Sequence, residues 1–110
     1  MSGEPLDLIA HLNARRDELA DRLARLDHEA RRSSEPLVAD FAEQAVQREN
    51  DDVVDRLRET TSAELREVTA ALRRVAAGTF GKCMRCGSPI EAARLRAVPY
   101  SSLCMACLEK

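Results

Sequence analysis

The four cysteines of this chain fall into two Cys-x-x-Cys pairs, "CMRC" at 83–86 and "CMAC" at 104–107. Two residues between paired cysteines let one tight turn present both sulfurs to a single metal ion. The 17 residues between the pairs fit the spacing of a structural four-thiolate zinc site. Gly87, directly after the first pair, permits the turn that such a site requires. The pattern predicts one structural zinc ion bound by Cys83, Cys86, Cys104 and Cys107.

Two disulfides or a redox-active Cys-x-x-Cys are the alternatives. No thioredoxin-like βαβ pattern surrounds either pair, and the N-terminus "MSGEPLDLIAHL" lacks the basic start and apolar core of a signal peptide. We therefore expect a cytoplasmic protein, in which thiols stay reduced and paired cysteines favour a metal. No run of 18 apolar residues predicts a membrane span. A catalytic zinc is not expected, because four thiolates leave no coordination position for water.

Apolar residues at alternating steps of three and four predict two long helices ahead of the cysteines. The first helix is expected over residues 6–32, and "RRSSEP" at 31–36 ends it with turn residues. The second is expected from residues 37–41 to about Ala77, with Gly78 as a natural stop. The predicted seam, meaning the apolar line that faces the other helix, holds Ile9, Leu12, Leu19, Leu23, Leu26 and Ala30 with Arg16 in the missing place, and then Val54, Thr61, Val68 and Val75, flanked by Leu57, Leu65, Ala71 and Leu72.

Two long helices joined by a short turn that contains proline predict an antiparallel hairpin. A helix over 6–32 would be ~40 Å long at 1.5 Å per residue. The expected fold is all-α, with a coiled-coil helical hairpin over residues 1–77, its tip near 33–46, and a four-cysteine zinc finger over 78–110. Charged residues make up 33% of the chain, which has only two Phe and one Tyr. That composition suits long solvated helices better than a compact globule.

Charge and motifs exclude several classes of function. The net charge of −2 gives no polycationic signature for DNA binding. Residues 40–59 nevertheless hold seven acids against three arginines, and residues 78–110 hold five bases against two acids. His11 and His28 neighbour neither a cysteine nor each other, so we interpret both as surface residues. No phosphate-binding loop and no Ser/His/Asp arrangement is present, so an enzyme is not expected.

The string "GTFGKCMRCGSPIEAARLRAVPYSSLCMAC", residues 78–107, closely resembles the zinc finger of the DksA/TraR family of bacterial transcription factors. Those proteins bind RNA polymerase directly and do not contact DNA. The expected hairpin ahead of the finger is similar to theirs as well, so the resemblance covers nearly the whole chain. The matching positions are Phe80, Gly81, Cys83, Cys86, Gly87, Ile90, Arg94, Leu95, Ala97, Pro99, Cys104 and Cys107.

The resemblance implies that the coiled coil enters the secondary channel of RNA polymerase and that its tip approaches the catalytic centre. The family's tip carries two acids three positions apart, followed by an alanine. Counting back from the first finger cysteine without gaps places this motif on Asp40, Glu43 and Ala45. Glu43 stands where Asp is typical, and its extra methylene moves the carboxylate out by ~1 Å, a displacement that matters at a catalytic centre.

The same register implies that guanosine tetraphosphate binds weakly or not at all. Larger family members bind this alarmone at the coiled coil and finger. Several basic residues expected there are replaced by Ala63, Glu67, Val98 and Leu108. A polyanion needs Lys or Arg to replace its lost hydration, and Glu67 would repel it.

The resulting hypothesis is a monomeric RNA polymerase-binding regulator that acts through the secondary channel with an acidic tip. One alternative is a DksA-like paralogue that has weak or no regulatory activity and another protein partner. A second is a transcript-cleavage factor that lends its acids to a catalytic Mg²⁺, although the zinc finger argues against it. A DNA-binding zinc ribbon is a third, and the net charge disfavours it.

Overall fold

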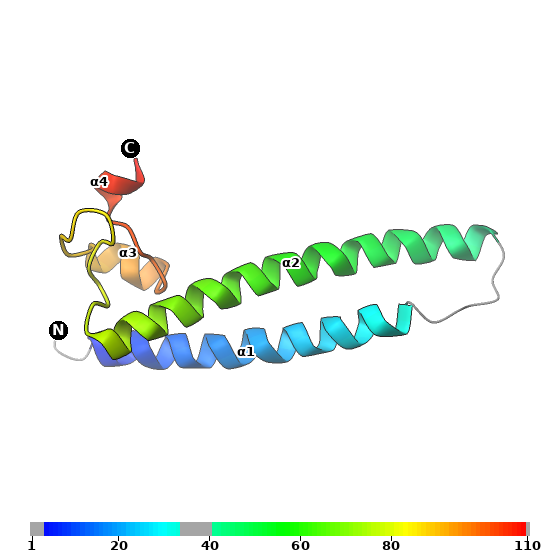
Figure 1. The fold of residues 1–110 in the computed structure, drawn as a ribbon, viewed down its shortest axis with the longest axis horizontal. Helices are drawn as coiled ribbons and strands as arrows, with labels where there is room; N and C mark the ends of the chain where they lie inside the picture. Colours follow the sequence, from blue (N-terminus) through cyan, green and yellow to red (C-terminus); the bar gives the residue numbers. More distant parts are fainter. Residues whose placement is uncertain (1–3, 34–40, 110) are drawn as a thin grey trace. The chain divides into compact units, whose positions relative to one another are not determined.

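The architecture is an antiparallel pair of long helices followed by a small cysteine-rich finger (Figure 1). A computed structural model describes residues 4–33 and 41–109. Its helices are α1 (Glu4–Ser33), α2 (Phe41–Ala77), α3 (Ala92–Ala97) and α4 (Met105–Leu108). In the described residues, strand-like pairing is limited to one isolated bridge between Lys82 and Pro89. The predicted all-α fold, a coiled-coil hairpin with a four-cysteine finger, is confirmed.

The helix boundaries lie close to those expected from sequence. α1 extends the predicted 6–32 by a few residues, and α2 begins at Phe41, at the late end of its predicted start. Gly78 ends α2 as predicted, with a φ of +78° that glycine adopts without the strain of a side chain. Its N–H donates to the carbonyl of Val75 at 3.2 Å, and the N–H of Thr79 donates to Arg74 at 2.9 Å. These two bonds form a Schellman motif, which satisfies carbonyls at the helix end.

The chain divides into two compact units. The first, here called the mid-chain unit, is Glu18–Leu65. Leu19 and Val54 are its buried apolar side chains among the described residues, and Thr61 is buried in the same seam. Arg58 of α2 pairs with Asp27 of α1 at 2.9 Å, with both side chains 40% exposed. An ion pair so exposed contributes little stability, so this unit depends on a thin apolar seam.

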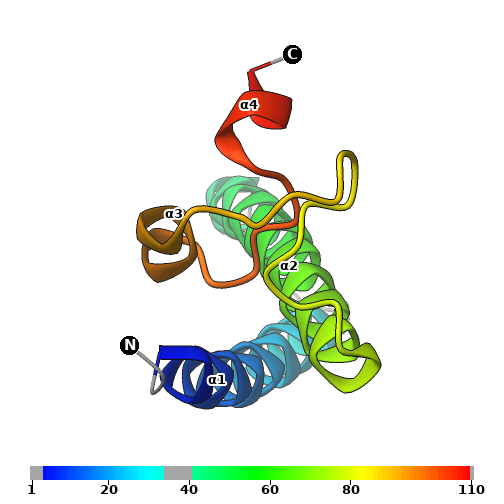
Figure 2. The same ribbon diagram turned by 90° about the vertical axis from the view of Figure 1, so that its left-hand side faces the viewer.

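The second unit, here called the finger unit, joins Met1–Asp17 to Arg66–Lys110. It therefore contains the first turns of α1, the last turns of α2 and the whole finger, as the end view in Figure 2 shows. Leu12, Val68 and Ala71 are fully buried here. A second cluster places Leu8 of α1 with Ile90, Leu95 and three of the cysteines. The finger thus packs on the helix pair through an apolar core shared with α1.

The predicted seam is correct at most buried positions and wrong at two. Leu57 was expected to flank the seam, yet it is 48% exposed. It lies three residues after Val54, about 60° away around the helix, and α1 does not cover that face. In α1, Leu8 is buried and Ile9 only half-buried. Leu8 precedes Ile9 by one residue, so its side chain leaves α1 in a different direction and packs with residues of the finger. Helix periodicity alone cannot predict this contact.

A matched pair of leucine truncations tests this register. Leu19→Ala removes a fully buried side chain and is expected to lower the free energy of unfolding by about 2–4 kcal/mol. Leu57→Ala removes a half-exposed side chain and is expected to cost less than about 1 kcal/mol. Urea unfolding followed by helical circular dichroism measures both values. Equal losses from the two substitutions would show that the seam of the mid-chain unit is assigned wrongly.

Candidate metal centre and partner-binding residues

The first cysteine pair lies on a tight turn between α2 and α3. The N–H of Cys83 donates to the carbonyl of Ser88 at 2.7 Å, and the N–H of Gly87 donates back to Cys83 at 2.9 Å. Gly87 has a φ of +78°, which any residue with a side chain would adopt only with strain. The predicted role of Gly87 in turning the chain is therefore confirmed, and the turn brings the Cys83 and Cys86 sulfurs to one side.

The second pair begins α4. Cys104 is the residue before the first turn of this helix, and Cys107 lies three residues on, so both side chains fall on one face. The Glu91 carboxylate accepts a hydrogen bond from the N–H of Met105 at 3.2 Å. The N–H groups of Glu91 itself and of Met105 hold the pKa of that carboxyl below its ordinary value. Glu91 thereby fixes the start of α4 next to Cys104.

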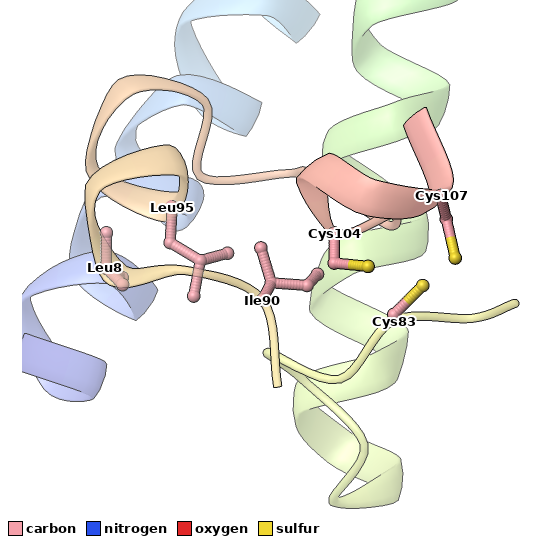
Figure 3. Close-up of a cluster of buried hydrophobic side chains, with 6 residues drawn as sticks. All are labelled: Leu8, Cys83, Ile90, Leu95, Cys104 and Cys107. Atoms are coloured by element: carbon pink, nitrogen blue, oxygen red, sulfur yellow. The ribbon is translucent and has the colours of Figure 1, made fainter. Parts of the chain in front are cut away.

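The four cysteine sulfurs converge, with every pair within 4.8 Å. Figure 3 shows three of the cysteines, Cys83, Cys104 and Cys107, on facing segments. The Cys86 and Cys104 sulfurs are 3.7 Å apart. A tetrahedral zinc ion with Zn–S bonds of ~2.3 Å requires sulfur–sulfur separations of about 3.8 Å. A disulfide would need about 2.05 Å, and all four cysteines are free thiols. The donor set and its spacing therefore fit zinc.

The ionisation of the thiols differs sharply within the cluster. Backbone hydrogen bonds from Cys104 and Cys86 lower the pKa of Cys83 to about 6. The hydroxyl and backbone of Ser88 lower the pKa of Cys86. Burial, together with the neighbouring sulfurs, raises the pKa of Cys107 to about 12. A divalent cation that coordinates a thiol replaces its proton outright, so zinc would supply the charge that four thiolates need.

Apolar side chains shield one side of the cluster. Cys83, Cys104 and Cys107 are buried in one core with Leu8, Ile90 and Leu95 (Figure 3). The partly buried Phe80 and Leu103 pack against this core. Cys86 is the exposed member of the four. Sequence analysis missed Leu8, whose contact partners lie some 75–100 positions away along the chain. The surrounding sequence "LDLI" predicts only that Leu8 lies on the apolar face of a helix, and it does not indicate contact with the finger.

Arginines fix the loops around the cluster by bonding backbone carbonyls. Arg85 donates to the carbonyl of Cys107 at 3.4 Å, and Arg94 donates to Leu103 at 3.2 Å. Arg74 of α2 donates to the carbonyls of Tyr100 and Ser101 at 3.2 and 3.4 Å. Burial lowers the pKa of Arg74, and the nearby Glu67 opposes that shift. Sequence analysis did not identify Arg74, because nothing in the helix pattern distinguishes an arginine that reaches the finger from the other arginines of α2.

The structure describes only part of the predicted tip. Asp40 lies outside the described residues, and Glu43 and Ala45 are exposed on the first turns of α2. His11 and His28 are also exposed, as predicted for surface residues. Ala63, Glu67 and Leu108, three of the four positions assigned to the alarmone site, are exposed, and Val98 is half-buried. In the described residues, no helix is both long and apolar enough to span a membrane.

Two protein families account for nearly the whole chain. Residues 78–110 match the prokaryotic dksA/traR C4-type zinc finger, and residues 9–75 match the N-terminal domain of the DnaK suppressor protein-like family. An uncharacterized protein from Aquifex aeolicus is 38% identical over 60 residues, which are 54% of this chain and 41% of the relative. The chain thus spans about four tenths of the length of that curated relative.

Two solved structures share the fold. The transcription factor DksA2 from Pseudomonas aeruginosa is 30% identical and matches with a TM-score of 0.83 over 97% of this chain and 81% of its own. The DnaK suppressor protein from Agrobacterium tumefaciens is 38% identical, with a TM-score of 0.62 over 94% of this chain and 89% of its own. Together with the converging sulfurs, the C4-type finger shows that this chain holds one structural zinc ion.

Substitution of one cysteine tests the coupling of metal and finger. Cys83→Ser is expected to abolish stoichiometric zinc binding and to unfold the finger, because site formation and folding are coupled. Much of α1 and α2 should stay helical. The measurements are zinc content by mass spectrometry and the amide spectrum of residues 78–109. The control is Met84→Ala. Met84 lies between Cys83 and Cys86 but is 63% exposed, so this variant should keep the metal. A folded, metal-free Cys83→Ser finger would contradict the account.

Proposed function

Because this chain belongs to the DksA/TraR family and is a DksA-type transcription factor, we propose that it binds RNA polymerase through the secondary channel. Its acidic tip, Asp40, Glu43 and Ala45, then acts near the catalytic centre. The protein does this as a monomer that does not contact DNA directly. The observation that carries the proposal is the start of α2, where Glu43 and Ala45 are exposed.

The position of Glu43 suits an electrostatic role. It lies in the first turn of α2, where unpaired N–H groups and the helix dipole favour a negative charge. A carboxylate at that position can approach groups that coordinate the catalytic metal ions or orient the incoming nucleotide. Glu43 therefore modulates initiation by changing the field near the centre, without performing chemistry itself.

The two parts of the chain have separate tasks. Residues 1–77 form the hairpin that carries the tip, and residues 78–110 form the finger. Zinc bound by Cys83, Cys86, Cys104 and Cys107 holds the finger, and the apolar cluster around Leu8 fixes the finger on the helix pair. The geometry of the tip matters because a displacement of ~1 Å there can change rates by ~100-fold.

Substitutions at the tip test the proposal in a transcription assay on a ribosomal RNA promoter. Asp40→Asn removes one charge and should abolish the effect on initiation while polymerase binding falls far less. Little stability should be lost, because the sequence predicts an exposed turn at this position, where few native contacts are expected. Glu43→Asp should increase activity if the extra methylene misplaces the carboxylate.

The matched control is Glu29→Gln, which removes an acid from the exposed surface of α1 and should act as wild type does. If Asp40→Asn also matches wild type on a responsive promoter, the functional tip lies elsewhere. A protein that binds polymerase without changing initiation would instead support the alternative of a weakly active paralogue. Shortened transcripts in stalled complexes would support a cleavage factor.

A second prediction concerns guanosine tetraphosphate. Each charge-assisted hydrogen bond from Lys or Arg contributes about 1.5–3 kcal/mol. The loss of two such partners at Ala63, Glu67, Val98 and Leu108 would weaken binding by ~3 kcal/mol or more, roughly a hundredfold. Arg74, which could have compensated, already donates to two carbonyls of the finger. Any effect of this protein on transcription should therefore be nearly independent of the alarmone.

A promoter titration measures this dependence, using a polymerase whose other alarmone site has been removed. The double substitution Glu67→Lys with Leu108→Lys restores two cations and should make the response to the alarmone larger. A strong alarmone-dependent enhancement with the unaltered protein would show that other residues bind the ligand.

A further inference from the structure

Two side chains at the start of α3 bond the backbone on both sides of Cys104. The Glu91 carboxylate accepts a hydrogen bond from the N–H of Met105 at 3.2 Å. The Nε–H of Arg94 donates to the carbonyl of Leu103, also at 3.2 Å. Leu103 and Met105 are the immediate neighbours of Cys104 in the chain. Glu91 and Arg94, here called the α3 clamp, therefore hold the two peptide bonds that flank one zinc ligand.

The α3 clamp is itself fixed in place. Glu91 directly precedes α3 and Arg94 lies three residues on, so both side chains can reach the same segment. The N–H of Leu95 donates to the carbonyl of Glu91 at 3.1 Å, and the N–H of Val98 donates to the carbonyl of Arg94 at 2.7 Å. The Leu95 side chain is buried in the same core as Cys104 (Figure 3). The clamp thus extends from a helix that packs on the zinc-binding core.

The surroundings of Cys104 differ from those of the other ligands. Cys83 is held within its own turn, where its N–H donates to the carbonyl of Ser88 at 2.7 Å. Arg85 reaches the carbonyl of Cys107 by a longer bond of 3.4 Å. At Cys104 both adjoining peptide bonds are held by side chains of a separate helix. The position of this ligand therefore depends on contacts outside its own segment.

Local structure alone cannot fix Cys104. It directly precedes α4, which has four residues, and a helix so short is not stable by itself. Contacts that restrict the backbone before zinc arrives reduce the conformational entropy that binding must remove. Outer partners of metal ligands typically change metal affinity by about 10–100-fold. The α3 clamp bonds to peptide groups and not to the sulfur, so we expect an effect of about tenfold.

We propose that Glu91 and Arg94 are positioning residues for zinc, which hold Cys104 ready for coordination and so set how tightly and for how long the finger keeps its metal. Neither residue is a ligand. The N–H of Met105 needs an acceptor and the carbonyl of Leu103 needs a donor, so the two side chains are not interchangeable. This inference does not depend on polymerase binding.

The test measures zinc binding by the full chain in competition with a colorimetric chelator, and zinc release after mixing with excess EDTA. Glu91→Ala and Arg94→Ala should each weaken the zinc affinity about tenfold and speed release. Glu91→Gln keeps a carbonyl acceptor and should lose less than Glu91→Ala. The controls are Glu109→Ala and Arg73→Ala, which remove an acid and a base from exposed positions and should change the affinity by less than about twofold.

Cobalt substitution separates positioning of a ligand from folding of the finger. Saturating Co²⁺ should give Glu91→Ala and Arg94→Ala the same tetrahedral four-thiolate absorption as wild type, because all four sulfurs remain. Cys104→Ser should change that absorption. The double variant Glu91→Ala with Arg94→Ala should lose less affinity than the product of the two single losses, because the two residues hold the same ligand.

The inference is supported by a weakened zinc affinity, faster release and an unchanged cobalt spectrum in both clamp variants. It is wrong if both variants bind and release zinc as wild type does, or if the two controls lose as much affinity as the clamp variants. It is also wrong if the clamp variants lack the tetrahedral spectrum at saturating Co²⁺, because Glu91 and Arg94 would then be needed to fold the finger and not to position one ligand.

Discussion

The fold of the finger depends on bringing together four cysteine sulfurs whose two pairs are separated by 17 residues of sequence. Of the large apolar side chains between Gly78 and Glu109, only Ile90 and Leu95 are buried, apart from the cysteines. Burial of each contributes roughly 1.5–3 kcal/mol, whereas a structural zinc ion contributes ~10–16 kcal/mol in comparable small domains. Zinc binding therefore contributes more to the stability of the finger than burial of these two side chains does. The apolar cluster around Leu8 fixes the position at which the finger packs on the helices.

Two different kinds of interaction thus hold the two parts of the chain. The helix pair is stabilised by a seam of single buried residues such as Leu12, Leu19 and Val68, and its surface ion pairs add little. The finger is stabilised by coordination and by directional hydrogen bonds from Arg74, Arg85 and Arg94 to backbone carbonyls. A chain that consists mostly of two solvated helices has few other ways to bury a core.

Local patterns in the sequence predicted much of this structure. The Cys-x-x-Cys pairs, the glycines at 78 and 87 and the heptad spacing each act over a few residues, and the metal site, the two glycine turns and the two long helices predicted from them are confirmed. The errors involve contacts between distant segments. Leu8 is buried by residues of the finger, and Leu57 is exposed because α1 covers an adjacent face of α2. Periodicity identifies the apolar face of one helix and does not reveal what covers it.

The central claim is that residues at the start of α2 reach the catalytic centre of RNA polymerase. The most direct measurement places a photo-crosslinking phenylalanine analogue at the exposed position of Ala45 in the zinc-loaded full chain and maps the crosslinked peptides of polymerase by mass spectrometry. The account predicts crosslinks to segments that border the catalytic centre, which are lost when the secondary channel is blocked. Crosslinks confined to the outer surface of polymerase, or unaffected by blocking the channel, would contradict it.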